Sequence, residues 1–346
     1  MVKIFKKIIG TLMVIAGIGL FFYPDISDWY LEKQTEQYIS EFQDEYKKNS
    51  EESSEGTDKE TDKEKETSSD ETKEAKNETE MSDDKLYQEI VTYNVSIYEN
   101  GQAGFKDAWS YERPPISLKG LSDGKFGYIQ IPAMDVTLPL YVGASDSNMA
   151  KGAVILGQTS IPLGGENTNS VIAGHRGWST GNFFLNIEEI SIDDMVYITN
   201  PWQTLAYRVE SIDIIDPYDS DAVKIQEGRD MVTLVTCHPY MSRGKYRYVV
   251  YCIRDKDAES DDMVTVKKNV SGKTAGSGHS DSQAQSDSLP DQKNYITASD
   301  GTVYESSNEL IQKEDLVRRI CGTTIILIVL FSLIYTRVQD KKTTDY

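Results

Sequence analysis

Hydrophobic positions divide the chain into two apolar segments near its ends, two polar stretches, and a central region of short apolar runs. The apolar segments are Ile8–Tyr23 and Ile320–Tyr335. Each is slightly shorter than the roughly 20 residues that span a bilayer comfortably, but flanking tyrosines, lysines and arginines can complete the span at the two interfaces. We therefore expect each segment to be a transmembrane helix.

Flanking residues predict the orientation of both anchors. The sequence FFYPDISDW after the first apolar run offers no small-residue cleavage site, which favours an uncleaved anchor over a signal peptide. Lysines precede the first segment, and Arg337 and further lysines follow the second. Because basic residues gather on the cytoplasmic side, we expect a multi-pass protein of the plasma membrane with both termini in the cytoplasm and its middle outside the cell. Arg318 and Arg319, just before the second segment, run against this orientation.

Polar stretches separate these anchors from the central region. Residues 26–84 begin with a helix, indicated by aromatic residues at helical intervals, and continue as an acidic run, Glu51–Glu80, without any large apolar side chain. Such a run cannot bury enough apolar surface to offset chain entropy, so it predicts a disordered spacer. A second spacer, rich in Ser, Asp, Lys and Gly, is expected over 256–317. The remaining units are the start and first anchor at 1–25 and the second anchor with its tail at 318–346.

The central region, residues 85–255, is predicted to be one folded domain that is mainly β. It opens with a helix over Leu86–Tyr98 that is apolar on one face. Runs of β-branched and aromatic residues, bounded by Gly, Pro, Asn or Asp, then favour a sandwich or barrel over βαβ units. The expected strands are Phe126–Pro132, Thr137–Val142, Ser170–His175, Met195–Thr199, Leu205–Ile215, Met231–Cys237 and Tyr246–Arg254.

Composition and charge exclude several classes of function. The chain carries 36 Lys and Arg against 56 Asp and Glu, a formal net charge of −20. No broad basic surface is therefore available to a nucleic-acid partner. The three cysteines include no CxxC pair and do not suggest a disulfide framework, and the three histidines do not cluster with them at zinc spacing. We expect no structural metal.

Three side chains in or at the ends of strands are suited to act together in thiol chemistry. Cys237 ends an apolar strand and His175 ends another, at positions where a rigid sheet meets its loops. A neighbouring imidazolium supplies both the charge that favours a thiolate and a proton for a leaving group. Arg247, within the strand YRYVVYC, carries a fixed charge and forked donors that suit a developing oxyanion. Taken singly, each has a plainer interpretation as a core thiol, a turn histidine or a surface charge.

The remaining cysteines and histidines are assigned structural or solvent-exposed positions. Cys252 lies mid-strand with the alternation opposite to that of the strand's arginine, and is expected in the core. Cys321 lies in the second apolar segment. His238 directly follows Cys237, so strand alternation aims it to the other side. His279 lies in the second spacer.

Several separated motifs, in a fixed order, resemble those of the sortase transpeptidases. They are GYIQIP, LPLYVG, GAVILGQTSIPLGGENTNSVIAGHRGW and TLVTCHPY, followed by an arginine in the next strand, and they extend from about Tyr87 to Arg254. The chain most resembles class C, the pilin-polymerising kind, in its TCxPY run, its anchors at both ends and its upstream segment FKDAWSY. The resemblance implies a closed eight-stranded β-barrel with short helices, and chemistry that needs no cofactor.

The resemblance also implies roles for the three residues. Cys237 would be the nucleophile, His175 the acid/base and Arg247 the stabilising cation. The substrates would be pilins or surface proteins with an LPXTG-like sorting signal, cleaved at the Thr–Gly bond to a thioacyl enzyme. An amine, either a pilin lysine or a wall-precursor amine, would then resolve this intermediate. A thiol hydrolase and a non-catalytic surface binding protein are the alternatives.

A lid over the active site is a further implication of the resemblance to class C. Lids of that class carry an Asp-Pro-aromatic motif, and the corresponding residues here are Asp107, Ala108 and Trp109, in a segment of about 103–115. Alanine replaces the lid proline, so the lid backbone is less constrained. HPYMSRGKYR has one more residue between the cysteine and the strand arginine than class C leads us to expect. Arg243 is therefore a second candidate for the cation, although it falls in the turn.

Overall fold

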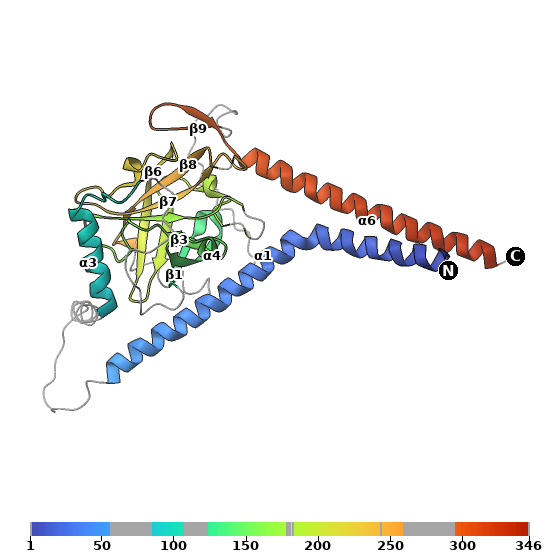
Figure 1. Ribbon diagram of the computed structural model, residues 1–346, viewed down its shortest axis with the longest axis horizontal. Helices are drawn as coiled ribbons and strands as arrows, with labels where there is room; N and C mark the ends of the chain where they lie inside the picture. Colours follow the sequence, from blue (N-terminus) through green and yellow to red (C-terminus); the bar gives the residue numbers. More distant parts are fainter. Residues whose placement is uncertain are drawn as a thin grey trace.

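The computed structural model describes residues 2–55, 85–106, 124–177, 181, 183–242, 244–258 and 295–344 of the chain. A β-barrel with short helices forms its centre (Figure 1). Two long helices lead away from the barrel side by side, so that both ends of the chain lie close together.

Eight strands close into a barrel in the order β1-β2-β3-β4-β7-β8-β6-β5. All neighbours are antiparallel except β2 with β3 and β4 with β7, which are parallel. The eight-stranded barrel expected from the resemblance is thus confirmed. The strands are β1 (Lys125–Ile131), β2 (Val136–Val142), β3 (Ala153–Ile155), β4 (Thr168–Ala173), β5 (Met195–Thr199), β6 (Thr204–Ile215), β7 (Asp230–His238) and β8 (Tyr246–Arg254).

The seven predicted strands all form, with bounds that differ by at most two residues at either end. β4 ends at Ala173, so His175 lies just beyond the strand that was expected to include it. The short strand β3 was not predicted, because an alternation of period two cannot be recognised in three residues. It forms by pairing with β2 and β4, which lie on either side of it in the barrel.

A helix precedes the first barrel strand, and short helices lie in the connections between strands. The predicted helix over Leu86–Tyr98 is confirmed as α3 (Lys85–Glu99), whose buried residues are Ile90, Tyr93, Asn94 and Ile97. Their spacing of three and four residues is that of one helical face. The short helices are α4 (Asp146–Met149) and the 3-10 helices η2 (Pro132–Met134), η3 (Ile187–Glu189) and η4 (Asp221–Val223).

Two apolar clusters lie on opposite faces of the barrel wall. The larger cluster draws on all eight strands, fills the interior, and includes the fully buried Cys252, as strand alternation predicted. The smaller cluster lies on the other face and contains Ala173, Val235 and Val249, together with Phe105. Since alternate residues of a strand share a face, this smaller cluster marks the face on which residues 237 and 247 lie.

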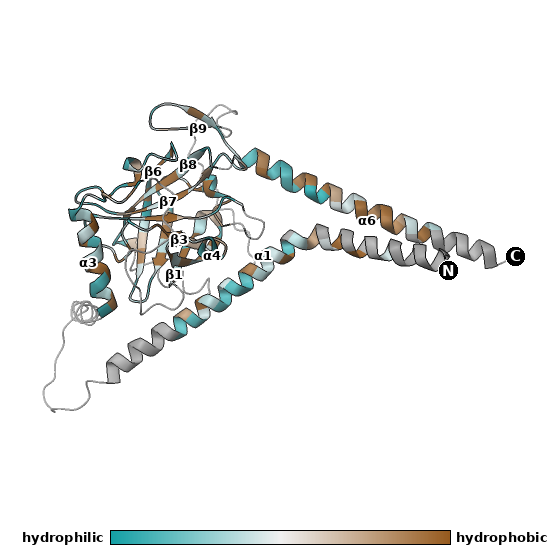
Figure 2. Ribbon diagram, in the orientation of Figure 1, coloured by the Kyte–Doolittle hydropathy of each residue, from teal (hydrophilic) through white to brown (hydrophobic). Residues whose placement is uncertain are grey.

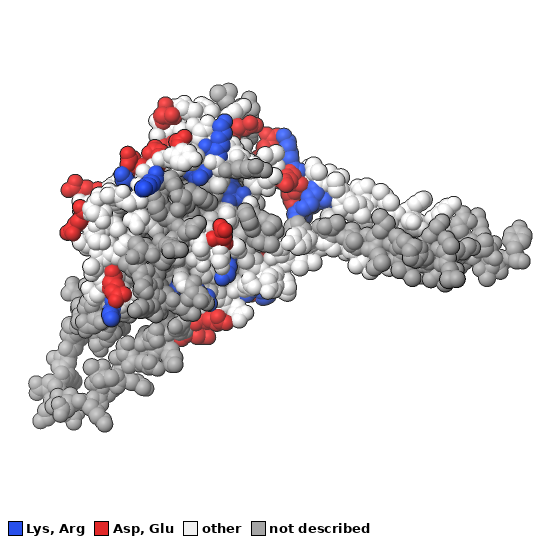
Figure 3. Space-filling model, in the orientation of Figure 1, with Lys and Arg blue, Asp and Glu red and all other residues white. Residues whose placement is uncertain are grey.

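The two long helices contain the terminal apolar segments. They are α1 (Val2–Glu55) and α6 (Asn308–Thr344), and they touch where Gly322 lies against the ring of Phe21. Apolar residues extend along the described part of α6 (Figure 2), while Figure 3 shows charged side chains over the barrel and at the start of this helix. Among the residues that the structure describes, no helix combines the length and the apolar character needed to cross a membrane.

The α1 helix also crosses the outside of the barrel. The Tyr38 hydroxyl donates to the carbonyl of Gly127 at 2.8 Å, and Tyr38 and Ile39 are buried with Tyr128 in a separate small apolar cluster. The helix continues to Glu55, and the rest of the predicted acidic spacer lies outside the described residues. One helix therefore joins the barrel wall to the first apolar segment.

A hairpin occupies the end of the predicted second spacer. It consists of β9 (Tyr295–Thr297) and β10 (Val303–Glu305), and α6 begins three residues later. The predicted disorder over 256–317 is therefore wrong for residues 295–317. Ala298 is buried in the main core, and Ile296 and Tyr304 pack against it, which offsets the entropy of ordering the segment. Residues 259–294 lie outside the described part.

Candidate active site

Cys237 and Arg247 are directly opposite each other on the antiparallel strands β7 and β8. Residues paired in this way have β-carbons roughly 4.5–5.5 Å apart on the same face of the sheet. Both side chains border Gly244: a β-carbon there would lie 3.2 Å from the Cys237 sulfur and 2.5 Å from Nη1 of Arg247. The strand pairing therefore brings a thiol and a fixed cation to one site.

The turn before β8 holds the Arg247 side chain. Its Nη1 donates to the carbonyl of Gly244 at 2.7 Å and to that of Tyr246 at 3.2 Å. Gly244 has a φ of +80°, a conformation that glycine adopts without strain. The absence of a side chain at this position leaves the space that the guanidinium fills. Arg243, the second candidate for the cation, lies outside the described residues.

His175 reaches the same site from the end of β4. The last registered pair between the parallel strands β4 and β7 is Ala173 with Val235, and the Gly174 N–H donates to the Val235 carbonyl at 3.2 Å. Extended by two residues beyond the end of β4, the same register would set His175 opposite Cys237. Cys237 and Arg247 thus lie on β7 and β8, and His175 follows β4, the next strand in the barrel.

Burial favours the neutral forms of both the Cys237 thiol and the His175 imidazole. Burial lowers the pKa of His175, and the charge of Asp146 opposes this only in part. Burial raises the pKa of the Cys237 thiol, although the charges of Arg247 and Arg176 pull it down. The sequence argument assumed an imidazolium beside a thiolate. The two pKa shifts instead favour the neutral imidazole and the neutral thiol.

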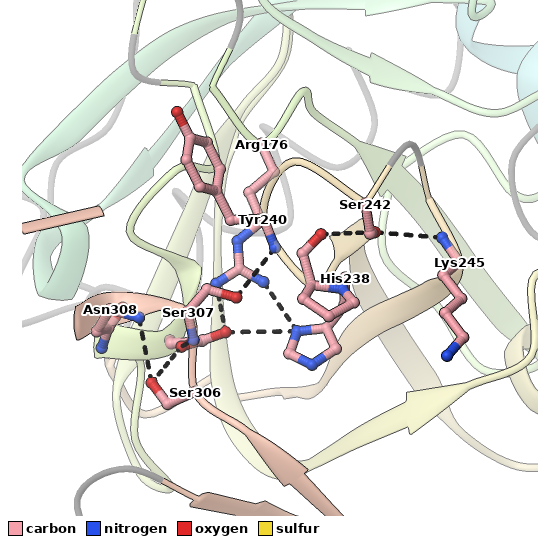
Figure 4. A network of polar contacts seen from close by, with 10 residues as sticks. Arg176, His238, Tyr240, Ser242, Lys245, Ser306, Ser307 and Asn308 are labelled. Carbon is pink, nitrogen blue, oxygen red and sulfur yellow. Dashed lines mark hydrogen bonds and ion pairs between the residues drawn. The ribbon is translucent and has the colours of Figure 1, made fainter. Parts of the chain in front are cut away.

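The residues that directly follow His175 and Cys237 meet on the other side of the sheet (Figure 4). These are Arg176 and His238, whose Nη1 and Nδ1 atoms lie 3.0 Å apart. Arg176 also forms an ion pair with Glu188 of η3, and Oε1 of Glu188 lies 3.4 Å from Nδ1 of His238. We call Arg176, Glu188 and His238 the buried triad, because their side chains are at most 2% exposed.

Ionisation of Glu188 is strongly favoured within the buried triad. Burial alone would raise the pKa of this carboxyl, but contacts with His238, Arg176 and Ser306 outweigh burial and hold it at about 2. Strand alternation had predicted that His238 points away from the thiol. Sequence reasoning missed Arg176 and Glu188, because an arginine in a GHRG turn and a glutamate in a short polar helix both suggest solvent exposure.

The described residues contain no group of three or more His, Cys, Asp or Glu arranged to hold a metal ion. The predicted lid residues Asp107, Ala108 and Trp109 lie outside the part of the chain that the structure describes. Phe105, just before them, is buried in the smaller apolar cluster beside Ala173 and Val235. Phe105 therefore places the start of the predicted lid segment on the face of the barrel that carries the candidate site.

Comparison with known proteins relates the barrel to the sortases. The family model for the sortase domain matches residues 129–255. The chain is 27% identical to sortase A of Bacillus anthracis over 157 residues, which are 44% of this chain and 72% of the relative. It is similar to a crystal structure of Streptococcus agalactiae sortase C1, with 31% identity over 51% of this chain and 91% of that one, at a TM-score of 0.47. A Streptococcus pneumoniae sortase C structure matches with 32% identity over 52% and 95% of the two chains, at a TM-score of 0.41.

The matched region contains the whole Cys237, His175 and Arg247 constellation at the ends of neighbouring barrel strands. Sortases are cysteine transpeptidases that act on proteins carrying sorting signals. Residues 129–255 of this chain therefore form a sortase domain.

Proposed function

We propose that this protein is a membrane-anchored sortase that joins pilins through an LPXTG-like sorting signal, with Cys237 as nucleophile. The observation that carries the proposal is the pairing of Cys237 with Arg247 across β7 and β8, beside the strand end that bears His175. Thiol chemistry makes use of all three side chains, as nucleophile, base and stabilising cation. A non-catalytic binding protein would have no need of it.

The proposed reaction has two halves. In the first, His175 takes the proton of the Cys237 thiol and the sulfur attacks the threonine carbonyl of the sorting signal. Arg247 stabilises the developing oxyanion. His175 then returns the proton to the departing glycine amine, which leaves a thioacyl enzyme. In the second half, an amine attacks the thioester, His175 accepts its proton, and the thiol is regenerated with a new amide bond as the product.

A pilin lysine is the acceptor that we favour, because the TCxPY run, the two terminal apolar segments and the FKDAWSY segment resemble class C sortases. The second candidate is an amine of a wall precursor, which would anchor a surface protein instead of extending a pilus. Both acceptors use the same first half-reaction. They differ in the amine that the site admits.

Incubation with an LPXTG-type peptide, with and without an added amine, tests the proposed function. Product joined to the amine supports transpeptidation, and a lysine-bearing pilin peptide should be preferred over a wall-precursor amine. Cleavage without joining would identify a thiol hydrolase. A lid can silence a true enzyme, so absence of turnover in both the wild type and an opened lid variant would indicate a binding protein.

We further propose that the segment of about 103–115 is an inhibitory lid in which Trp109 covers Cys237 and Asp107 pairs with Arg247. Support comes from the described residues just before it. Gln102 donates from Nε2 to the Gln158 carbonyl at 2.9 Å and accepts from the Ile225 N–H at 2.7 Å, which fixes the start of the segment. A tryptophan in a polar loop is costly to leave in water and normally finds a pocket.

Replacement of both Asp107 and Trp109 by alanine is expected to speed alkylation of Cys237 severalfold and to raise peptide turnover. The physical reason is that the pair would otherwise occupy the cation and cover the thiol that the substrate needs. Rates of modification by a thiol reagent, followed by mass spectrometry, measure the effect. Tyr111→Ala in the same segment is the control and should change little. Unchanged thiol reactivity in the double variant would mean that the segment is not a lid.

We also propose that α1 and α6 anchor the protein in the plasma membrane, with both termini in the cytoplasm and the barrel outside. Support comes from the contact between the two helices and from the run Ile320–Thr336 of α6, which contains no charged residue. Seventeen helical residues extend about 26 Å, so the interfacial tyrosines and arginines must complete the span. Protease added to cells after wall removal should release a fragment that contains Cys237. Protection of that fragment would contradict the orientation.

A further inference from the structure

The segment between the hairpin and α6 reaches the back of the candidate active site. We call Ser306 and Ser307 the serine clamp. We propose that the serine clamp and the buried triad form a positioning unit that sets the reactivity of Cys237 from the opposite face of the sheet. The segment that leads into the C-terminal helix would then contribute to catalysis by the barrel. The inference rests on the proposed function only in assigning Cys237 as the reactive thiol.

The serine clamp binds the carboxylate of the buried triad directly. The Ser306 hydroxyl donates to Oε2 of Glu188 at 2.6 Å, and the Ser307 N–H donates to the same oxygen at 2.8 Å. The other carboxylate oxygen, Oε1, pairs with Arg176. Glu188 thus connects the clamp to the residue that follows His175.

A second set of contacts connects the clamp to the chain that follows Cys237. The Tyr240 N–H donates to the Ser307 hydroxyl at 3.0 Å. Tyr304 of β10 meets the His238 ring edge-to-face, with centroids 6.0 Å apart, and the Tyr246 ring at 5.1 Å. The segment therefore holds the ends of both β7 and β8, the two strands that carry the thiol and the strand arginine.

The buried triad also acts on the thiol through charge. Besides Arg247 on the near face, Arg176 is the second cation whose charge counteracts the effect of burial on the Cys237 thiol. The guanidinium of Arg176 is buried, so water screens it little. Because Glu188 and His238 fix this guanidinium, its distance from the sulfur depends on contacts that the serine clamp completes.

The position of the clamp in the chain distinguishes it from the core of the fold. The family match ends at residue 255, whereas the clamp lies immediately before α6, which begins at Asn308. A displacement of α6 at its first turn would pull on Glu188 and Tyr240 together. The hydrogen bonds of the serine clamp consequently link the position of α6 to the positions of the side chains around Cys237.

Removal of the clamp hydroxyls tests the proposal in the full-length protein. Ser306→Ala combined with Ser307→Ala is expected to lower kcat for peptide transfer about tenfold, with KM within about twofold of the wild type, the size of a typical effect on a group that orients a reactive residue. The pH midpoint for alkylation of Cys237 by iodoacetamide should move upwards, because Arg176 is less firmly held. His175 and Arg247, the other groups facing the thiol, remain unchanged in this variant.

Two further variants separate positioning from simple stabilisation. Ser306→Thr retains the hydroxyl and should restore the wild-type alkylation profile relative to Ser306→Ala. Ser299→Ala removes a hydrogen bond from the same hairpin to Asp213, away from the buried triad, and should leave kcat and the profile unaltered. A clamp variant that lowers only the melting temperature, or a Ser299→Ala variant with the same kinetic effect, would overturn the proposal.

Alkylation requires no peptide, so it separates failure of this inference from failure of the proposed function. If the clamp variant moves the alkylation midpoint while the wild type transfers no peptide, the proposed function fails and the positioning unit is supported. If peptide transfer occurs and the clamp variant matches the wild type in both assays, the proposed function is supported and the positioning unit is rejected.

Discussion

Replacement of Cys237 by alanine is expected to abolish thioacyl formation and to reduce transfer of peptide to amine to background. The proposed covalent route passes through this sulfur, and no other thiol borders the site. Cys237 is only partly buried at the end of β7 and belongs to neither of the two main apolar clusters, so the domain should remain folded. His175→Ala is expected to have the same effect, because the neutral thiol would lack its base.

Cys252→Ala provides a matched control for the loss of a thiol. Cys252 is fully buried in the barrel interior on β8, where burial raises its pKa well above the usual range of a thiol. Its replacement should lower the melting temperature through the cavity it leaves, while transfer activity is retained. Mass spectrometry of the acyl-enzyme and circular dichroism separate the two variants. Continued joining of peptide to amine by Cys237→Ala would overturn the assignment of the nucleophile.

Replacement of Arg247 by alanine should reduce kcat by about 100-fold or more, which is the usual cost of removing one donor from an oxyanion site. Arg247→Lys should recover little of this activity. Lysine carries the charge, but it cannot copy the planar guanidinium, in which Nη1 donates to the carbonyls of Gly244 and Tyr246 and further N–H groups face the site. In Arg247→Ala the pH midpoint for alkylation of Cys237 should rise, because the Arg247 charge pulls the pKa of that thiol downward.

Arg243→Ala is the informative comparison for this prediction. It removes an arginine from the same turn, and we expect it to retain most of the activity. Steady-state kinetics with a sorting-signal peptide and an amine measure all three variants. An inactive Arg243→Ala with an active Arg247→Ala would show that the turn arginine, and not the strand arginine, is the stabilising cation.

The elements that could be predicted from the sequence are those whose signal lies within a short stretch of chain. α3 and seven of the eight barrel strands could be predicted because each buries one face through a period that its own residues specify. β3 carries too few residues for such a period, and it forms only because β2 and β4 flank it in the closed barrel. The β9–β10 hairpin was taken for spacer because its few apolar residues, among them Ile296 and Tyr304, gain stability only against a core built elsewhere.

Amino-acid sequence alone determined the barrel strands, the interior position of Cys252, and the choice of Cys237, His175 and Arg247. Each of these follows from where a residue falls along its own strand, since alternation and strand ends are properties of a short stretch of chain.

Only the tertiary structure determines which residues lie on the opposite face of the sheet from Cys237. Ser306 and Glu188 are 118 residues apart in the chain, and Arg176 and His238 are 62 apart. No local pattern marks such contacts, because an arginine or glutamate in a turn carries the same signal whether solvent or a buried counter-charge surrounds it. Only closure of the barrel and docking of the segment before α6 take these charges out of water and bring them together.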